Sequence, residues 1–436
     1  MTPESSTVEA IDRHGFWDPA IFDDELEKIF KTSWLFVAHE SELEQKGDYV
    51  TRTMGAEAVI VTRDEAGQPR VFLNTCTHRG GQLCRADLGN TSHFRCSYHG
   101  WTFSNKGELR GVPELRAVYP AQFDRKAHGL AGARVDSFAG LIFATFNPDA
   151  PSLQDYLGDL GWYLKAYFGK APMEVVGAPT RGILRSNWKV GAENYGGDAY
   201  HVGTTHHSAV ELGVFGNPEE TAKLGPLASG NFVYCVDAGN GHCIRIQKLP
   251  IEFEKPTLLG YPPELWGLFA SNLSDDQLAV NSGLAVAHGN VFPNFSFLAA
   301  LSPPEPNQPP IRSLHVRQWQ PISADRTELT MWSLVPKDAP EEWKRQSHAA
   351  VVRTLGFGGL FETDDLQNWV GMAETNRGSI SRQQELVYEA VLGDPPLQSP
   401  WPGKVYAADH SEVGLLALHR RWHELMRDGN PSAQSV

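Results

Sequence analysis

Two short segments of the sequence each carry one cysteine and one histidine. The first is Cys76-x-His78, and seventeen residues later comes Cys96-x-x-His99. Two thiolates on one iron and two imidazoles on the other describe a Rieske [2Fe–2S] centre. A zinc site is the alternative, but zinc sites usually pair cysteine with cysteine and histidine with histidine. The mixed order of the ligands therefore predicts a [2Fe–2S] cluster.

A second candidate metal site is the segment Asp198-x-x-His201-x4-His206. We expect a helix from Trp188 to His201, which would place Asp198 and His201 on one face because they are three residues apart. Gly203 would end or loosen this helix and let His206 turn back toward His201. Two histidines and one carboxylate form the facial triad of non-haem Fe(II) oxygenases, which leaves positions open for O2. By itself the spacing is also compatible with a cluster of solvated histidines.

The first site lies in a strand-dense, glycine-rich region. Asp18 and Pro19 precede it and predict the start of an amphipathic helix. Each Cys/His pair follows a short β-rich run, so two tight loops can converge on one site. The predicted strands are 58–63, 70–74, 93–96, 101–104 and 140–146, and residues 147–151 (Asn-Pro-Asp-Ala-Pro) predict a domain boundary.

The second site lies in a mixed region after this boundary. We expect strands at 181–186, 232–236, 243–247, 290–298, 314–320 and 329–335. Helices are expected at 340–355 and 411–426, with another beginning near Asp364. Strands in succession with long helices near the end predict an antiparallel α+β domain.

Composition narrows the class of protein. The 436 residues suggest two domains, and a net charge of −14 makes nucleic acid an improbable partner. Five cysteines are an odd number, which fits a reducing compartment better than a disulfide framework. Without an apolar run of membrane-spanning length or a secretory h-region, we expect a cytoplasmic protein.

The residues of both sites resemble a known family, the α (large) subunits of Rieske non-haem iron ring-hydroxylating dioxygenases of naphthalene and biphenyl type. Respiratory Rieske proteins carry an extra cysteine in each loop, whereas Gly81 and Tyr98 stand there in this chain. The resemblance implies an α+β fold in which a β-rich Rieske domain is inserted into a helix-grip catalytic domain. It divides the chain into a helical part (1–35), the Rieske domain (36–150) and the catalytic domain (151–436).

The resemblance also implies roles around the iron. The segment Phe361-Glu-Thr-Asp364-Asp365 matches a family motif whose second aspartate binds iron, which implies Asp365 as ligand, with Asp364 as the alternative. The histidine after His201 is expected to be His206, although the spacing in biphenyl-type members would select His207.

The family does not use the aspartate at the position of Asp198 as an iron ligand. It implies that Asp198 hydrogen-bonds His201 and reaches the Rieske histidine of a neighbouring subunit. Electrons would then pass from His99 through Asp198 to His201, and we expect Asp198 and Asn194 to act in catalysis.

Pocket residues are implied by the same resemblance, and most are apolar or aromatic. Because none is basic, we expect a neutral mono- to polycyclic aromatic hydrocarbon and a cis-dihydrodiol product. Arg185 or Arg245 could reach the pocket, so an aromatic carboxylate of the phthalate, cumate or benzoate type is the alternative. A Rieske monooxygenase or demethylase would share all the metal motifs. The implied pocket residues are Asn194, Tyr195, Val202, His288, Asn290, Leu355 and Phe361.

The expected partners follow from what the sequence lacks. It has no nucleotide-binding fingerprint, and Gly239-Asn-Gly241 lies in a predicted turn. NAD(P)H should therefore act through a separate reductase, with or without a ferredoxin. The resemblance implies a homotrimer of α subunits, or α3β3 with a small β subunit.

Overall fold

The computed structural model describes residues 11–212, 232–251, 253–305, 308–390, 392, 394–407 and 410–428. The chain forms two compact units, of which one is continuous (Phe30–Asp155) and the other joins Met1–Ile29 to Tyr156–Val436. Among these described residues, no helix is long and apolar enough to cross a membrane. Both units contain antiparallel sheets and helices, which confirms the predicted α+β class.

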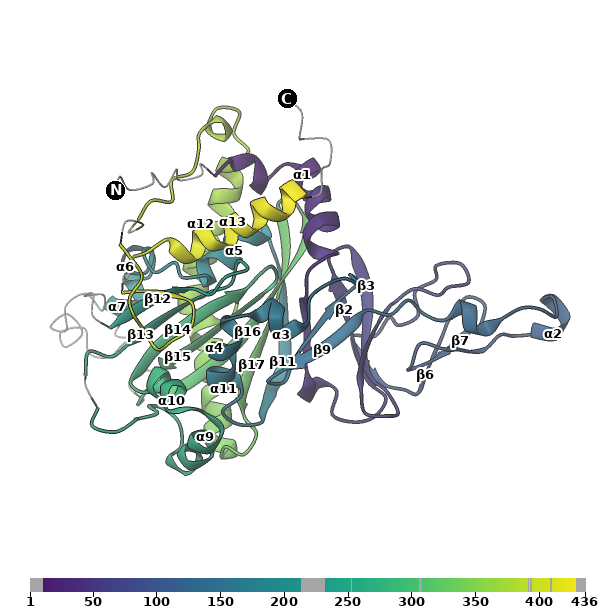
Figure 1. Cartoon of the computed structure of the whole chain (residues 1–436), viewed down its shortest axis with the longest axis horizontal. Helices are drawn as coiled ribbons and strands as arrows, with labels where there is room; N and C mark the ends of the chain where they lie inside the picture. The colour runs from purple at the N-terminus through teal and green to yellow at the C-terminus, as the bar shows by residue number, and fades with distance from the viewer. Residues whose placement is uncertain are drawn as a thin grey trace. The chain divides into compact units, whose positions relative to one another are not determined.

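The smaller unit contains three antiparallel sheets and little helix (Figure 1). A buried cluster that includes Ile60, Phe94, Trp101 and Phe103 forms its core around both Cys/His loops. The sheets, in spatial order, are β1 (Leu35–His39), β10 (Leu141–Thr145) and β9 (Arg134–Phe138); β4 (Pro69–Leu73), β3 (Glu57–Arg63), β2 (Asp48–Met54) and β5 (Leu88–Asn90); and β6 (His93–Arg95), β7 (Thr102–Ser104) and β8 (Leu109–Gly111). The short helices are η3 (Glu40–Glu42), α2 (Leu115–Val118) and η4 (Arg125–His128).

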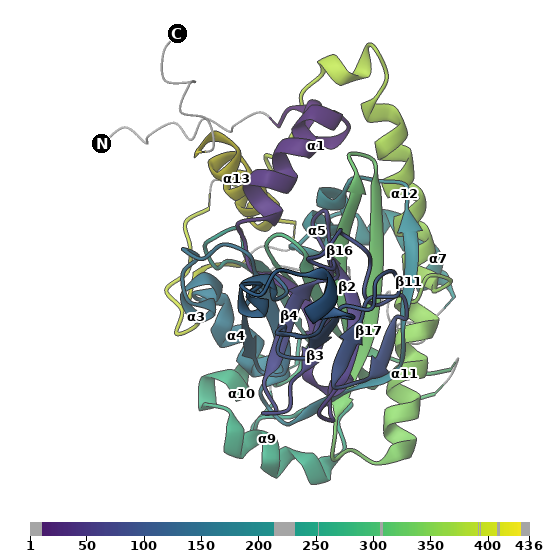
Figure 2. The same cartoon turned by 90° about the vertical axis from the view of Figure 1, so that its right-hand side faces the viewer.

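The larger unit is built on an eight-stranded antiparallel sheet (Figures 1 and 2). The predicted hairpin at Gly239-Asn-Gly241 is confirmed, since it joins β12 to β13. In spatial order the strands are β11 (Met173–Leu184), β17 (Arg326–Pro336), β16 (Ile311–Ser323), β15 (Phe295–Ser302), β14 (Leu284–Val291), β13 (Cys243–Lys248), β12 (Val233–Asp237) and β18 (Lys404–Tyr406).

The helices of this unit cover both faces of the sheet. On β16, His315, Arg317 and Trp319 lie on the face that carries α5, while α4 packs its Tyr167 and Phe168 against Phe297 on the opposite face. The helices are η1 (Arg13–Phe16), α1 (Pro19–Glu25), η2 (Leu26–Phe30), α3 (Leu153–Leu157), α4 (Leu160–Phe168), α5 (Trp188–Tyr195), α6 (Val202–Thr205), α7 (His207–Glu211), η5 (Pro263–Leu265), α9 (Trp266–Asn272), α10 (Asp275–Asn281), α11 (Glu341–Leu355), α12 (Leu360–Asn376), η6 (Ser381–Gln383) and α13 (Val413–Asp428).

Local sequence signals explain where several elements begin. Asp18 caps α1 as predicted, because its Oδ1 accepts a hydrogen bond of 2.8 Å from the N–H of Ala20 and Pro19 is the first helical residue. At α5, Asn187 caps in the same way by accepting from Lys189.

Two predicted elements are wrong. The helix expected from Trp188 to His201 ends at Tyr195, because Gly196 and Gly197 follow it and Gly197 has a φ of +134°. The strand expected at 290–298 is the end of β14, a turn at 292–294 and the start of β15. Pro293 lies in that turn, where it does not interrupt the hydrogen bonds of the sheet.

Candidate metal centres

The two Cys/His loops of the smaller unit share one backbone hydrogen-bond pattern. In each, the cysteine N–H donates to the carbonyl five residues later, and the N–H of a glycine four residues later donates back to the cysteine carbonyl. These distances are 2.8 and 2.8 Å in Cys76–Gly81, and 2.8 and 3.0 Å in Cys96–Trp101. Gly80 and Gly100 both have a φ of +74°, which glycine adopts without strain.

The loops bring like ligands together. The thiols of Cys76 and Cys96 are neighbours and their residues are only 2% and 3% exposed, while the rings of His78 and His99 have centroids 4.6 Å apart. Burial, followed by the neighbouring Cys96, raises the pKa of the Cys76 thiol. A two-iron cluster needs one pair of thiolates and one pair of imidazoles. This arrangement therefore fits it.

The His78 ring is held by aromatic neighbours. Trp101 stacks on it at 4.8 Å with an interplanar angle of 10°, and the hydroxyl of Tyr119 lies 3.4 Å from its Nε2. Its Nδ1 is buried and has no hydrogen-bond partner among the described residues. Burial, then His99 and Arg79, lowers the pKa of His78, which favours the neutral ring that binds metal.

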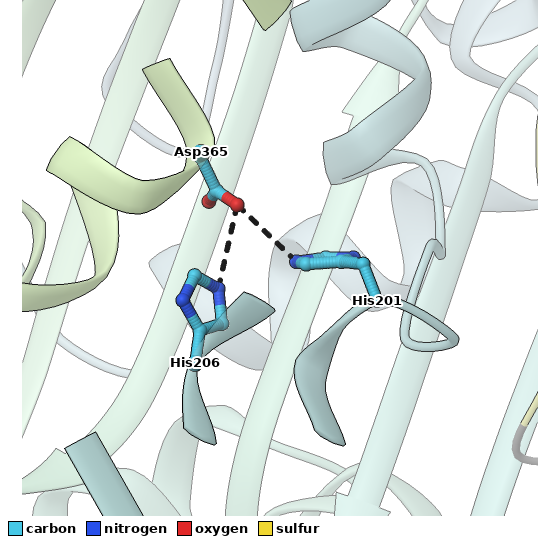
Figure 3. A group of neighbouring side chains, drawn as sticks. All are labelled: His201, His206 and Asp365. Carbon is cyan, nitrogen blue, oxygen red and sulfur yellow. Dashed lines mark ion pairs between the residues drawn. The ribbon is translucent and has the colours of Figure 1, made fainter. Parts of the chain in front are cut away.

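The second candidate site lies in the larger unit, where His201, His206 and Asp365 converge (Figure 3). Their ligand atoms all lie within 4.8 Å of one another. Asp365 Oδ1 is 3.4 Å from the Nε2 of His201 and 3.4 Å from the Nε2 of His206. Among the residues that the structure describes, His201, His206 and Asp365 form the group of three or more His, Cys, Asp or Glu side chains whose ligand atoms lie close enough to hold one metal ion.

Three different elements supply these side chains. His201 lies in the turn between α5 and α6, His206 follows the last residue of α6, and Asp365 is on α12. The sequence predicted that Asp198 and His201 share one face of a helix. They do not, because α5 ends at Tyr195, before both residues. The turn nevertheless places Asp198 Oδ2 3.2 Å from His201 Nδ1.

Each histidine has an acidic neighbour at its second ring nitrogen. Asp198 lies beside Nδ1 of His201, and Asp364 Oδ2 lies 3.5 Å from Nδ1 of His206. A carboxylate there favours the tautomer whose Nε2 is free to bind a metal. The position of Asp364 beside His206 Nδ1 was not predicted from the sequence, which gave Asp364 only as the alternative to Asp365 as iron ligand.

Electrostatics at the site reflect burial. Burial raises the pKa of Asp365 to about 7, and it lowers the pKa of His206 to about 4. For His201, burial lowers the pKa, but the hydrogen bond and charge of Asp198 outweigh it and the net shift is upward. Three mutually facing ligand groups of this kind would be stabilised by a divalent cation between them.

The structure also separates the alternatives that the sequence left open. His207 is exposed, lies 3.5 Å from Glu211 on α7, and does not belong to the group of converging ligand atoms. Asp364 approaches Nδ1 of His206 and not the point where the other ligand atoms meet. The geometry thus brings His206 and Asp365 into the group.

The expected pocket residues lie in varied surroundings. The ring of Phe361 packs edge-on against His206 at 5.0 Å, and Nδ1 of His288 lies 3.1 Å from the carbonyl oxygen of Tyr195. Asn194 is half-buried and accepts the N–H of Asp198, while Val202 is 37% exposed. Asn290 and Leu355 are buried. Their contact with a substrate stays a prediction.

One buried charged cluster beside the site was missed. Arg317 on β16 pairs with Glu362 on α12, and both side chains are fully buried. The sequence pattern did not reveal it, because Leu314 and Val316 alternate with His315 and Arg317, and such alternation predicts that the polar side chains face solvent.

Comparisons with known proteins now decide the family. Residues 33–125 match the Rieske [2Fe-2S] domain, and residues 154–428 match the catalytic domain of the ring hydroxylating alpha subunit. The chain belongs to the ring-hydroxylating alpha-subunit family. It is therefore a Rieske non-haem iron oxygenase, whose family carries a [2Fe–2S] cluster and a mononuclear iron.

Individual relatives cover nearly all of the chain. It is 38% identical over 419 residues to the large oxygenase component of the naphthalene 1,2-dioxygenase system of Pseudomonas aeruginosa, which covers 94% of this chain and 89% of that one. It is 33% identical over 430 residues to the N,N-dimethyl phenylurea N-demethylase subunit alpha of Sphingobium sp. (strain YBL2), with coverage of 95% and 91%.

A solved structure agrees in fold. Naphthalene 1,2-dioxygenase from Rhodococcus sp. bound to indole matches with a TM-score of 0.91 at 37% identity, over 97% of this chain and 95% of that one. The predicted resemblance to dioxygenase large subunits and the predicted Rieske and catalytic parts of the fold are confirmed.

Proposed function

We propose that this alpha subunit adds both atoms of O2 to the ring of a neutral aromatic compound. The observation that carries the proposal is the convergence of two imidazole nitrogens and one carboxylate oxygen within 4.8 Å. When bound, the cluster would supply electrons and the iron would activate O2. The proposed ligands are Cys76, His78, Cys96 and His99 for the cluster, and His201, His206 and Asp365 for Fe(II).

The chain's own residues prepare the iron site. Asp198 and Asp364 lie 3.2 and 3.5 Å from the Nδ1 atoms of His201 and His206, where a carboxylate favours the tautomer whose Nε2 is free to face Asp365. Phe361 packs edge-on against the His206 ring and would keep water from that side of the site. A dry site strengthens every charge interaction within it.

The substrate class is supported by the relatives and by the residues near the iron. Two solved or curated relatives are named for naphthalene, a neutral two-ring hydrocarbon. Phe361 supplies an aromatic ring beside the candidate ligand His206. The expected product is a cis-dihydrodiol.

Arg245 favours a second substrate class. It is 4% exposed on β13, directly opposite His288 on β14, and its charge contributes to lowering the pKa of His288 to about 3, after burial. It also acts on the pKa of His201. A cation this close to the site favours an aromatic substrate that carries a carboxylate.

N-demethylation is a second candidate reaction. It is favoured by the 33% identity to an N-demethylase alpha subunit over 95% of this chain. The same metal ligands would serve, and the difference would lie in how the substrate is oriented.

The family works with a reductase or ferredoxin and often with a β subunit, which fits the absence of a nucleotide-binding fingerprint in this sequence. We further propose an assembly of three alpha subunits, with or without β subunits, in which electrons pass from His99 of the adjacent subunit through Asp198 to His201.

A substrate panel tests these choices. Chemically reduced protein would be mixed with O2 and naphthalene, benzoate or an N,N-dimethylated phenylurea, and products identified by mass spectrometry. We expect the dihydrodiol of naphthalene, and Arg245→Gln should leave its yield unchanged. If the protein turns over benzoate alone, and Arg245→Gln abolishes that turnover, the proposed substrate class changes from a neutral hydrocarbon to an aromatic carboxylate. Formaldehyde release from the phenylurea alone would favour the demethylase.

A further inference from the structure

A buried ion pair lies next to the candidate iron site. Arg317 donates from Nη1 to Glu362 Oε1 at 2.9 Å and from Nη2 to Glu362 Oε2 at 2.5 Å. Both side chains are fully buried. Because desolvation offsets the attraction, replacing a buried ion pair by apolar residues is often neutral for stability. Fold stability alone therefore does not explain the pair.

The same guanidinium spans a glycine-rich link. Its Nη2 also donates to the carbonyl oxygen of Leu355 at 3.2 Å, and Leu355 is the last residue of α11. Residues 356–359 are Gly-Phe-Gly-Gly, and α12 then begins without a side-chain cap. Glycine leaves a link with few side-chain contacts and a high cost in conformational entropy. Arg317 thus holds the chain on both sides of this link.

The candidate iron ligand lies one helical turn beyond the ion pair. Asp365 follows Glu362 by three residues on α12, so the two side chains share a face of the helix. On its other side, the Arg317 guanidinium lies 4.3 Å from the ring centroid of Tyr195, the last residue of α5. The chain passes from Tyr195 into the turn that carries His201.

We propose that Arg317, acting through Glu362, is a positioning residue that fixes the start of α12 so that Asp365 meets the two histidines in a geometry ready for Fe(II). This inference rests on the proposed ligand set. Metal ligands must be held close to their final positions by surrounding contacts, and outer contacts of this kind typically change metal affinity by 10- to 100-fold.

The test is a double variant, Arg317→Met with Glu362→Leu. It removes both charges at once, so no buried charge is left unpaired and the fold should persist. Fe(II) affinity would be measured by chelator competition on apo-protein, with circular dichroism and the cluster absorbance as checks of folding. We expect a loss of affinity of roughly tenfold or more. Arg317→Lys keeps the charge but not the two-point contact, and it should be intermediate.

A matched control exists in the smaller unit. Arg52 and Glu42 form another largely buried pair, with Arg52 Nη2 2.5 Å from Glu42 Oε1 and a further hydrogen bond from Arg52 Nε to the carbonyl oxygen of Val37. The double variant Arg52→Met with Glu42→Leu should leave Fe(II) affinity at the wild-type value.

The outcomes separate the inference from the proposed function. If wild-type protein binds no mononuclear Fe(II), or Asp365→Ala binds it as tightly as wild type, the ligand set itself is wrong. If those references behave as expected and the folded Arg317→Met/Glu362→Leu variant keeps wild-type affinity, the positioning role is overturned. Should that double variant fail to fold, Arg317→Lys decides: wild-type affinity overturns the role and weakened affinity supports it.

Discussion

At the scale of single residues, each histidine of the candidate iron site faces one carboxylate with Nε2 and a different carboxylate with Nδ1. Both histidines turn Nε2 toward Asp365, and each turns Nδ1 toward a second carboxylate. The neighbouring residues His207 and Asp364 are of the same types but face elsewhere. The chemistry therefore depends on orientation as much as on residue type.

Replacing the two adjacent histidines separately tests this orientation. His206→Ala should lose about one iron equivalent per chain, because it removes one of three ligands that converge within 4.8 Å. His207→Ala should keep its iron, since that side chain is exposed on α7. Metal analysis of both purified variants gives the answer, and iron loss in His207→Ala alone would reverse the assignment.

Fe(II) binding should depend on pH through Asp365. Burial raises the pKa of this carboxyl to about 7, so below that pH a metal must displace its proton. Affinity should fall as pH falls below 7, by roughly tenfold per unit for Asp365 alone and more steeply where His201, whose pKa is also raised, holds a proton. His206, with a pKa of about 4, adds a proton only at lower pH. Chelator competition between pH 5.5 and 8 would show this slope, and a flat profile would contradict it.

The sequence predicts residue types and spacings well and orientation poorly. The spacing of Cys76, His78, Cys96 and His99 is distinctive because few sites combine these ligands in this order. By contrast, His206 and His207 differ only in which side of the chain they face, and that depends on where α5 and α6 end. Helix ends are the least predictable feature of a sequence.

At the scale of elements, short loops and early helix ends place the functional groups. Both cluster loops turn through a glycine with φ near +74°, and α5 stops at Tyr195 so that His201 lies in a turn. The link between α11 and α12 was not foreseen, because nothing local to residues 356–359 shows that Arg317, on a distant strand, lies against it.

Two glycines with the same strain but different neighbours test the cluster loops. Gly80 (φ +74°) and Gly67 (φ +80°) each have open space where a side chain would point. Alanine at either position should cost about 1 kcal/mol in the free energy of unfolding. Only Gly80→Ala should also change the visible spectrum of the cluster, because Gly67 lies in the β3–β4 hairpin. If Gly80→Ala and Gly67→Ala lose the same free energy of unfolding and have the same visible spectrum, Gly80 has no special role in the cluster loop.

At the scale of the whole molecule, the chain separates electron storage from oxygen chemistry into two units. Acidic and basic side chains balance within 30–155, so the net charge of −14 belongs to the rest of the chain. Each proposed site lies entirely within one unit.

This separation predicts that the sites can be emptied independently. Asp365→Ala should lose mononuclear iron and turnover while keeping the absorbance of the cluster, because the proposed cluster ligands all lie between 76 and 99 in the other unit. Iron content and the visible spectrum are measured on the same sample. Loss of both together would refute the assignment of Asp365.

The proposed dioxygenase reaction is tested most directly by a single turnover of chemically reduced protein with naphthalene under isotopically labelled O2. This supplies electrons without the partner reductase. We predict a dihydrodiol in which both new oxygen atoms carry the label. A product with one labelled oxygen, or turnover only by demethylation of an N-methylated substrate, would contradict the dioxygenase reaction while leaving the metal sites in place.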